Sequence, residues 1–179
     1  KPDIVNEFYE SEKYSFDTQS QKWKTKFNPE NYKAKNFSEE VIDAKNGNVV
    51  IKLGDKINYL NAKKLSNDRL KDILVSKESL YGKFLHKDVK INDEENGVIK
   101  IGTELNETII NQILDAKIHL LEISITNSIN KGGYMLTTIF NDKNNTKDEA
   151  ITEIYKMLRP GEPPTIEIAT QIFNNLFLV

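Results

Sequence analysis

The strongest constraint on the fold is a proline-rich linker near the end of the chain. Residues 159–165 have the sequence Arg-Pro-Gly-Glu-Pro-Pro-Thr and contain three of the five prolines. Proline has no N–H to donate and fixes its own φ, so this stretch suits neither a helix interior nor a central strand. Apolar residues at helical spacing stand on both sides of it. The sequence therefore predicts two helices joined by a rigid, sharply turning connector.

The helix before the linker is predicted over residues 146–159. Thr146 and Glu149 have the spacing of a capping box, in which each side chain satisfies a free backbone N–H. Pro160 ends this helix because it disfavours helical geometry at the residue before it. Thr165 is a good N-cap for the second helix. The apolar stripe of that second helix consists of Ala169, Ile172, Phe173, Leu176 and Phe177.

Arg159 and Glu162 are the candidate contact residues of the linker. A guanidinium group can donate two parallel hydrogen bonds to one carboxylate, which lysine cannot do. We therefore expect Arg159 to be held by a specific acceptor, with Glu162 as the nearest candidate. The alternative is a solvated arginine that is favoured only by the dipole at the helix C-terminus.

A tryptophan between two lysines marks a predicted hairpin near the start of the chain. Strands are predicted at residues 15–16 and 22–26, around a turn at 17–21. Trp23, flanked by Lys22 and Lys24, has the composition of a platform on which a nucleic-acid base stacks. A strand tryptophan that packs on its own core is the interpretation we prefer. A short helical pattern at 4–9 precedes the hairpin.

An internal repeat occupies the middle of the chain. The stretch 46–54, which starts with Asn-Gly and ends with Gly, matches 96–102, which is two residues shorter. Gly102 follows Gly54 by 48 residues, and the apolar positions beyond keep that offset. Each copy predicts a strand, an Asn-Gly hairpin turn, a second strand, an Asn-capped helix and a last strand. The last strands are predicted at 72–75 and 120–125, and a further strand is predicted at 134–140.

The composition argues against several classes of function. The absence of cysteine excludes disulfides and thiolate metal sites. The 25 basic residues are outweighed by 27 acidic ones, which leaves no electrostatic footprint for nucleic acid. His86 and His119 have no carboxylate or cysteine at ligand spacing beside them, so no zinc site is predicted. No Asp-x-Asp-x-Asp motif, phosphate-binding glycine loop or membrane-spanning run occurs, and we expect no catalytic, cofactor-binding or metal-ligating residue.

The run from Glu153 to Thr165, followed by Ala169 and Leu176-Phe177, resembles the β subunit of bacterial DNA-directed RNA polymerase. Weaker similarity extends through Trp23-Lys24, 80–83 and Gly133-Tyr134. The resembling region is the lobe, which forms one jaw of the DNA cleft. Together with the repeat, this implies an α+β fold, with a tandem ββαβ repeat insert on a mixed lobe segment that ends in helix, proline-rich turn and helix. The expected domains are 1–40, the lobe segment and entry to the insert; 41–127, the insertion; and 128–179, a lobe segment truncated at its C-terminus.

The resemblance also implies a function. It implies a non-catalytic structural and interaction segment of an enzyme of transcription, a nucleotidyltransferase, in which the lobe borders downstream DNA and the insert docks regulators. Its partners would be the rest of β and the β′, α and σ subunits, with magnesium held by β′ and with no membrane. The implied location is the bacterial cytoplasm, at the nucleoid. The alternatives are a free-standing α+β protein-interaction module and a helix-turn-helix DNA binder, which the lack of lysine and arginine in the second helix disfavours.

Overall fold

The computed structural model describes residues 1–32, 35–36, 40–52, 54–67, 70–92, 97–126 and 132–177. Helices and antiparallel strands are both present, which confirms the predicted α+β class. The chain divides into two compact units, residues 1–140 and residues 141–179. The predicted insertion limits, 41 and 127, both fall within the numbering of the first unit, and the division into lobe and insertion stays a prediction.

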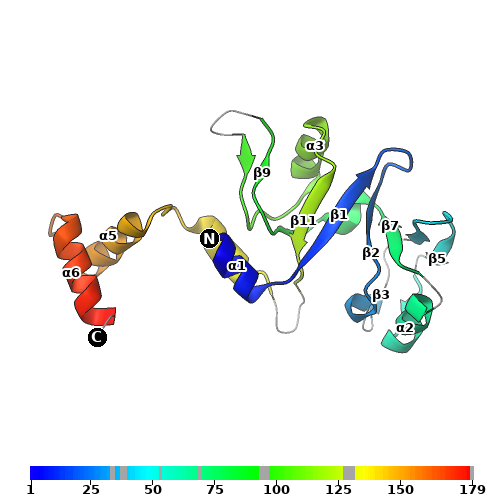
Figure 1. Ribbon diagram of the computed structural model, residues 1–179, viewed down its shortest axis with the longest axis horizontal. Helices are drawn as coiled ribbons and strands as arrows, with labels where there is room; N and C mark the ends of the chain where they lie inside the picture. The colour runs from blue at the N-terminus through cyan, green and yellow to red at the C-terminus, as the bar shows by residue number, and fades with distance from the viewer. Residues whose placement is uncertain are drawn as a thin grey trace. The chain divides into compact units, whose positions relative to one another are not determined.

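The first unit is built on a seven-stranded sheet with the order β5-β4-β7-β2-β1-β11-β8. All its pairs are antiparallel. Figure 1 shows the hairpin of β1 and β2 between β11 and β7. The strands are β1 (Ser11–Asp17), β2 (Lys22–Lys26), β4 (Val41–Asp43), β5 (Val49–Ile51), β7 (Asp72–Val75), β8 (Phe84–Leu85) and β11 (Leu120–Ser124). The predicted hairpin is therefore the centre of the sheet.

Short helices and two small strand pairs complete the first unit. The strand pairs are β3 (Lys35–Asn36) with β6 (Lys56–Ile57), and β9 (Val89–Lys90) with β10 (Val98–Ile99). The helices are α1 (Pro2–Phe8), α2 (Tyr59–Asn67), α3 (Glu107–Asp115) and α4 (Tyr134–Asn141), with 3-10 turns η1 (Pro29–Tyr32) and η2 (Lys77–Leu80). The two predicted asparagine caps are confirmed, because each Oδ1 accepts a backbone N–H three residues on, at 2.8 Å for Asn58 and 2.9 Å for Asn106.

The prediction of a strand at 134–140 is wrong, because this stretch forms α4. Its consecutive β-branched residues suggested a strand. The buried side chains are Leu136 and Ile139, which are three residues apart and so lie on one face of a helix. The hydroxyls of Thr137 and Thr138 donate to the backbone carbonyls four residues back, at 3.0 and 2.9 Å. The core against which this segment packs therefore selects the helical period over the local strand preference.

The order of elements recurs in both copies of the sequence repeat. Strand, strand, helix and strand appear as β4, β5, α2 and β7, with the short β6 inserted before α2, and then as β9, β10, α3 and β11. Gly54 and Gly102 both adopt left-handed φ angles, of 84° and 81°. The strands nevertheless pair differently, since β4 and β5 join β7 in the large sheet whereas β9 and β10 form a separate pair. A repeated ββαβ fold is therefore not confirmed. Asn96 of the second predicted Asn-Gly turn lies outside the described residues.

Trp23 lies in the main core, which both copies of the repeat share. Its side chain is fully buried, and its ring centroid is 5.2 Å from that of Phe16. Trp23 pairs with Val75 of β7 in register, and Tyr14 of the neighbouring strand pairs with Leu121 of β11. Side chains of α2 and α3 belong to the same core, namely Ala62, Ile110 and Ile113. The β1–β2 hairpin thus joins the two copies into one folded body.

A second, smaller core and one histidine attach α1 to the rest of this unit. Val5 and Tyr9 pack with Leu136 and Ile139 of α4. His86 is 4% exposed. Its Nδ1 lies 2.9 Å from the Ser124 hydroxyl and its Nε2 lies 2.8 Å from Oδ1 of Asn6 in α1. No helix among the described residues is long and apolar enough to cross a membrane.

Burial lowers the pKa of His86 below its ordinary value of 6.5, and the charge of Lys87 lowers it further against the opposing effect of Glu122. The unfolded chain therefore binds this proton more readily than the folded chain. The stability that comes from a neutral His86 is fully present above the unfolded pKa and is lost as the pH falls toward the lowered folded pKa.

We expect the melting temperature to fall as the pH is lowered from about 6.5 to about 5, because the unfolded histidine takes up its proton there and the folded one does so only at lower pH. The fall should be smaller in His86→Gln, because an amide does not titrate and can still reach a neighbouring polar group. Thermal unfolding followed by circular dichroism across this range measures both. The matched control is His119→Gln, which removes an exposed histidine and should keep the full pH dependence. An identical pH profile in His86→Gln and the parent chain would contradict the assignment.

Candidate functional site

The second unit is a hairpin of two helices, as the linker predicted. Its helices are α5 (Lys147–Leu158) and α6 (Ile166–Phe177). The capping box is confirmed, with the Glu149 N–H donating to Thr146 Oγ1 at 3.2 Å and the Thr146 N–H donating to Glu149 Oε2 at 3.2 Å. The buried side chains between the helices are Ile151, Tyr155 and Ala169. The small alanine lets the two helices approach closely.

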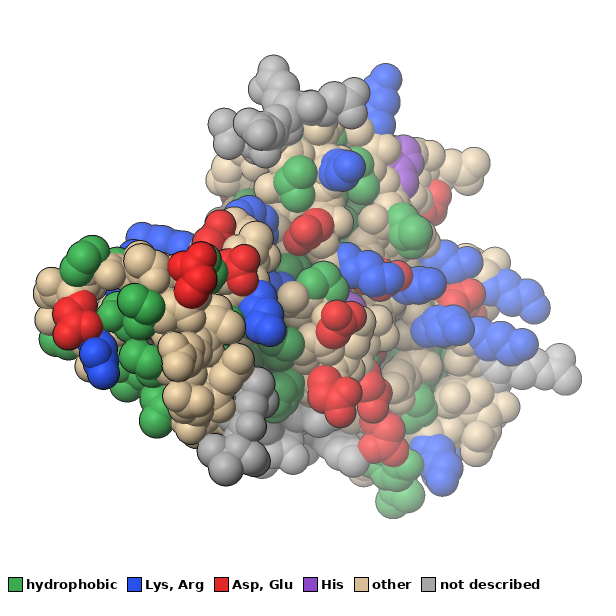
Figure 2. All heavy atoms as spheres, turned by 60° about the vertical axis from the view of Figure 1, so that its left-hand side comes forward, with side chains coloured by type: hydrophobic (Ala, Val, Ile, Leu, Met, Phe, Trp, Pro, Cys, Tyr) green, Lys and Arg blue, Asp and Glu red, His purple; other side chains and the backbone are tan. Residues whose placement is uncertain are grey.

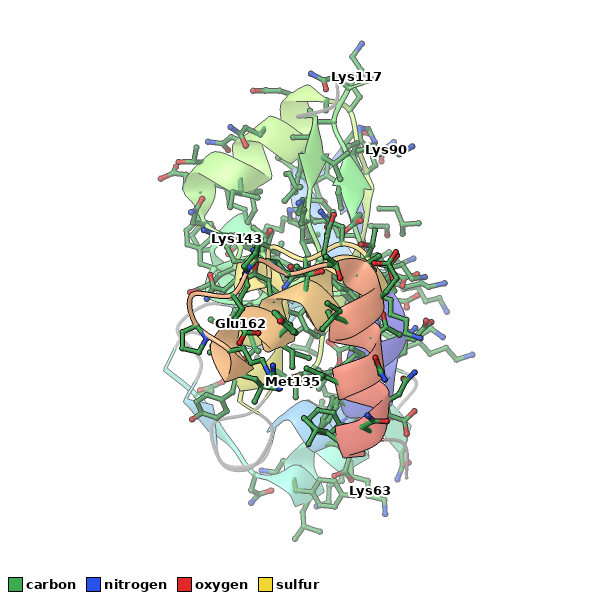
Figure 3. The ribbon with its side chains drawn as sticks, turned by 90° about the vertical axis from the view of Figure 1, so that its left-hand side faces the viewer. Lys63, Lys90, Lys117, Met135, Lys143 and Glu162 are labelled. Atoms are coloured by element: carbon green, nitrogen blue, oxygen red, sulfur yellow. The ribbon has the colours of Figure 1, made fainter. Side chains whose placement is uncertain are left out.

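Three side chains meet at the turn between the helices. Figure 3 shows Glu162 at this turn. Its Oε2 accepts a hydrogen bond from the Tyr155 hydroxyl at 2.9 Å and another from Arg159 Nη1 at 3.3 Å. Gly161 has φ +93°, which permits the reversal that brings Glu162 back to the helix. The Tyr155 bond lowers the pKa of Glu162 most, followed by the Arg159 bond, and the same Tyr155 bond raises the pKa of Tyr155.

The contact of Arg159 with Glu162 is the one that the sequence suggested, but it is a single long bond rather than two parallel ones. Both side chains are more than half exposed, at 53% and 56%. Solvent-exposed ion pairs of this kind contribute little to stability. The sequence analysis did not identify Tyr155 as a partner of Glu162. Its hydrogen bond to Glu162 is shorter than that of Arg159, and its side chain is more buried. Its position four residues before Arg159, on the same helix face, was the available indication.

The helix hairpin exposes several large apolar side chains, and α6 carries no basic residue. The only charged residue of α6 is Glu167, so phosphates would meet no cation there. This disfavours the helix-turn-helix alternative. Figure 2 shows hydrophobic side chains gathered on the hairpin. The exposed large apolar residues of this unit are Met157, Leu158, Ile166, Ile168, Leu176 and Phe177.

The lysines of the first hairpin lie on the face of the sheet opposite the core. Lys24 and Lys26 are exposed and alternate with the buried Trp23 and Thr25, and Lys22 is partly exposed. Lys24 pairs with Asp72 of the adjacent strand at 3.4 Å. Figure 2 shows that basic side chains elsewhere on the surface also lie beside acidic ones. The basic character of this face is therefore partly neutralised.

A second carboxylate lies close to two further lysines beside this face and offsets part of their charge. Glu122 of β11 lies 2.8 Å from Lys87 and 3.8 Å from Lys13. Its hydrogen bond with Lys87 is the main cause of the lowered pKa of Glu122. The sheet thus carries cross-strand ion pairs rather than a continuous basic surface.

Trp23 does not offer a stacking platform, because its ring is fully buried in the core. Its indole Nε1 has no hydrogen-bond partner among the described residues. Within that same part of the chain, no group of three or more histidine, aspartate or glutamate side chains is arranged to hold a metal ion. The ring centroid of His119 lies 6.0 Å from that of Phe16. His86 has different partners, so the two histidines do not form one site. The arrangement of these residues suits packing and surface contact.

We expect Glu162→Gln to lower the melting temperature of the chain more than Arg159→Lys does, because Glu162 accepts two hydrogen bonds and Arg159 donates only one of them. Thermal unfolding near neutral pH provides the measurement. The matched control is Glu153→Gln, which removes another exposed ion pair of α5, with Lys156, away from the turn. A larger fall in melting temperature for Glu153→Gln than for Glu162→Gln would show that the two hydrogen bonds at the turn stabilise the chain no more than an ordinary exposed ion pair does.

Comparison with known proteins gives matches of one kind over nearly the whole chain. The chain is 35% identical over 175 residues to the β subunits of DNA-directed RNA polymerase from Rickettsia conorii, Rickettsia felis and Rickettsia prowazekii. Each match covers 98% of this chain and 13% of the relative, so the chain spans about an eighth of the length of these proteins. No family model matches the chain. Nearly the whole chain therefore matches one segment of the β subunit of DNA-directed RNA polymerase, which confirms the resemblance seen in its sequence.

Proposed function

We propose that this chain acts as a non-catalytic structural and interaction segment of an RNA polymerase β subunit, in DNA-templated RNA synthesis. The observation that carries the proposal is the match to β subunits over 98% of the chain. Among the described residues, no contact favours a free-standing interaction module or a helix-turn-helix DNA binder over a role as a segment of the β subunit. The magnesium ion of the reaction would be held by the β′ subunit, so the segment itself would need no metal ligands.

The exposed apolar residues of the helix hairpin support a role within a larger assembly. Among residues 141–177, the buried core of this unit consists of three residues, with Ile172 and Phe173 packed against it. Large apolar surfaces that remain exposed in one part of a protein are typical of sites that other protein covers. The partners in the proposal are the rest of β together with β′, α and σ, in the cytoplasm at the nucleoid.

The two units would have different roles in that assembly. The unit that contains the proline-rich linker would belong to the lobe, which borders downstream DNA. Residues 41–127, which include five of the seven strands of the sheet in the first unit, would form the insertion, whose outer surface docks regulators. Because lysines of the sheet are paired with Asp72 and Glu122, contact with DNA would depend on the other subunits, which hold the segment beside the duplex.

A chimeric polymerase tests the proposal directly. The matching segment of the Rickettsia conorii β subunit is replaced by this chain, and the variant is reconstituted with β′, α and σ. We expect the chimera to assemble and to synthesise RNA at a rate within about tenfold of the parent, a change of roughly 1.4 kcal/mol in activation free energy. Gel filtration and a runoff transcription assay measure the two outcomes.

The matched control is a chimera that carries Gly161→Val. A branched side chain at φ +93° strains the linker while leaving the rest of the sequence unchanged. This variant should assemble less efficiently than the unmodified chimera. A correctly folded chimera that fails to bind the other subunits would overturn the proposal.

The isolated chain should bind duplex DNA weakly. Nonspecific affinity comes mainly from counterion release by cations on phosphates, and the chain has a net charge of −2. We expect a dissociation constant no tighter than the about 10⁻⁴–10⁻⁶ M that is typical of nonspecific binding at physiological salt. Fluorescence anisotropy with a labelled duplex measures it, and Lys24→Gln with Lys26→Gln should weaken any residual binding. Sub-micromolar binding with a steep salt dependence would favour the helix-turn-helix alternative instead.

A further inference from the structure

A buried histidine joins α1 to the large sheet of the first unit. His86 directly follows β8, and its backbone N–H donates to the Glu122 carbonyl of β11 at 2.9 Å. Its ring lies between two polar side chains, with Nε2 2.8 Å from Oδ1 of Asn6 and Nδ1 2.9 Å from the Ser124 hydroxyl. Asn6 belongs to α1, which leads into β1 (Figure 1), and Ser124 ends β11. The ring therefore bridges a helix that precedes the sheet and a strand within it.

The two partners determine which ring nitrogen carries the proton. An amide oxygen only accepts hydrogen bonds, so Nε2 must donate to Asn6. In the neutral ring Nδ1 then has a lone pair, which accepts the hydroxyl of Ser124. Both hydrogen bonds of His86 are satisfied in this one neutral tautomer.

A second proton on the ring does not fit this arrangement. It would bind Nδ1, which would then direct a donor at the hydroxyl of Ser124. Ser124 is 3% exposed, and in the described part of the chain its hydroxyl has no other hydrogen-bond partner, so its hydrogen would lose its acceptor. A buried imidazolium also loses most of its hydration. Both costs disappear when water reaches the ring.

The charged groups near His86 oppose one another. Glu122 favours the protonated ring and Lys87 disfavours it, and these two side chains form an ion pair at 2.8 Å. α1 presents the neutral Asn6 to the ring, and α4 carries no charged residue. The other ionisable residues of the neighbouring elements are exposed or bonded elsewhere, namely Asp3 and Glu7 of α1, Lys13 of β1, Lys83 and Asp88. Burial therefore dominates the response of His86 to pH.

The helix that His86 holds has little stability of its own. α1 has seven residues, and its N-cap Lys1 makes no side-chain cap bond. An isolated helix of this length is marginal in water. Its apolar contacts, through Val5 and Tyr9, belong to the small core with α4, which is separate from the main core around Trp23. The structure of the sheet therefore does not require α1 to stay attached.

We propose that His86 is an acid-sensitive latch, which holds α1 against the sheet when its ring is neutral and releases α1 when its ring is protonated. Release gives the imidazolium its hydration and leaves Ser124 free to bond with water. It also uncovers Val5 and the small core, while the main core stays folded. Local opening of this one helix thus precedes unfolding of the whole chain, and it requires no other polymerase subunit.

Amide hydrogen exchange of the full 179-residue chain, followed by NMR, measures this local opening. The reporters are the α1 amides, such as the Tyr9 N–H that donates to the Val5 carbonyl at 2.8 Å, and the amides of the β1–β11 pair are the reference. After correction for the intrinsic exchange rate, we expect the opening constant of α1 to rise about three- to twentyfold between pH 7 and pH 5. The uptake of one proton changes this constant by at most about tenfold for each pH unit.

α1 should also open more readily than the sheet throughout this pH range. An opening constant of α1 that does not depend on pH would overturn the proposal, because the helix would then detach without protonation of His86. An opening constant equal to that of the sheet would overturn it as well, since exchange would then require unfolding of the whole unit.

Two variants separate the latch from a general effect of acid. His86→Gln removes the titrating ring and should abolish the rise. Asn6→Asp keeps the shape of the side chain but places a carboxylate beside Nε2, which favours the protonated ring, so α1 should open less readily as the pH falls. The matched control is His119→Gln, which removes an exposed histidine and should keep the rise of the parent chain. A rise that persists in His86→Gln, or that is unchanged in Asn6→Asp, would contradict the latch. Circular dichroism melting verifies that each variant folds.

Discussion

The burial of Trp23 is the interaction on which the first unit depends. The strand that carries it lies between β1 and β7, and its neighbours bring in strands from both halves of the sequence repeat. Burying a large apolar side chain contributes about 1.5–3 kcal/mol, and the indole and its aromatic neighbour Phe16 also interact through their rings. The indole Nε1, which has no hydrogen-bond partner in the described part of the chain, opposes part of this gain. A truncation at this one position would therefore affect both halves of the sheet.

The same alternation that buries Trp23 determines what the opposite face presents. Because successive side chains of a strand point to opposite sides, Lys22, Lys24 and Lys26 lie on the solvated face. Cross-strand neighbours then supply carboxylates, as Asp72 does for Lys24. Burial of the core and partial neutralisation of the surface are thus two consequences of one register. This is why the proposed role assigns DNA contact to the assembled enzyme rather than to the isolated chain.

The helix hairpin illustrates a different balance. Its linker is stiffened by proline and reversed at Gly161, and the bonds of Glu162 to Tyr155 and Arg159 close the turn. Its own core is small, while Met157 and Phe177 stay exposed. A unit of 39 residues with so little buried surface gains limited stability from its own packing. Its conformation is therefore defined locally, whereas much of its stability in the proposed assembly would come from surrounding protein.

The sequence by itself determined the elements that depend on neighbouring residues. Four features follow from residues a few positions apart: the capping box of Thr146 and Glu149, the helix stop at Pro160, the β1–β2 hairpin and the family resemblance. Tertiary structure decided the helical state of 134–141, the unlike strand pairing of the two repeat copies and the contact of Tyr155 with Glu162. These features bring together segments that are distant along the chain or choose between two local preferences. Burial of apolar surface makes that choice, and local spacing carries no information on which distant surface is available.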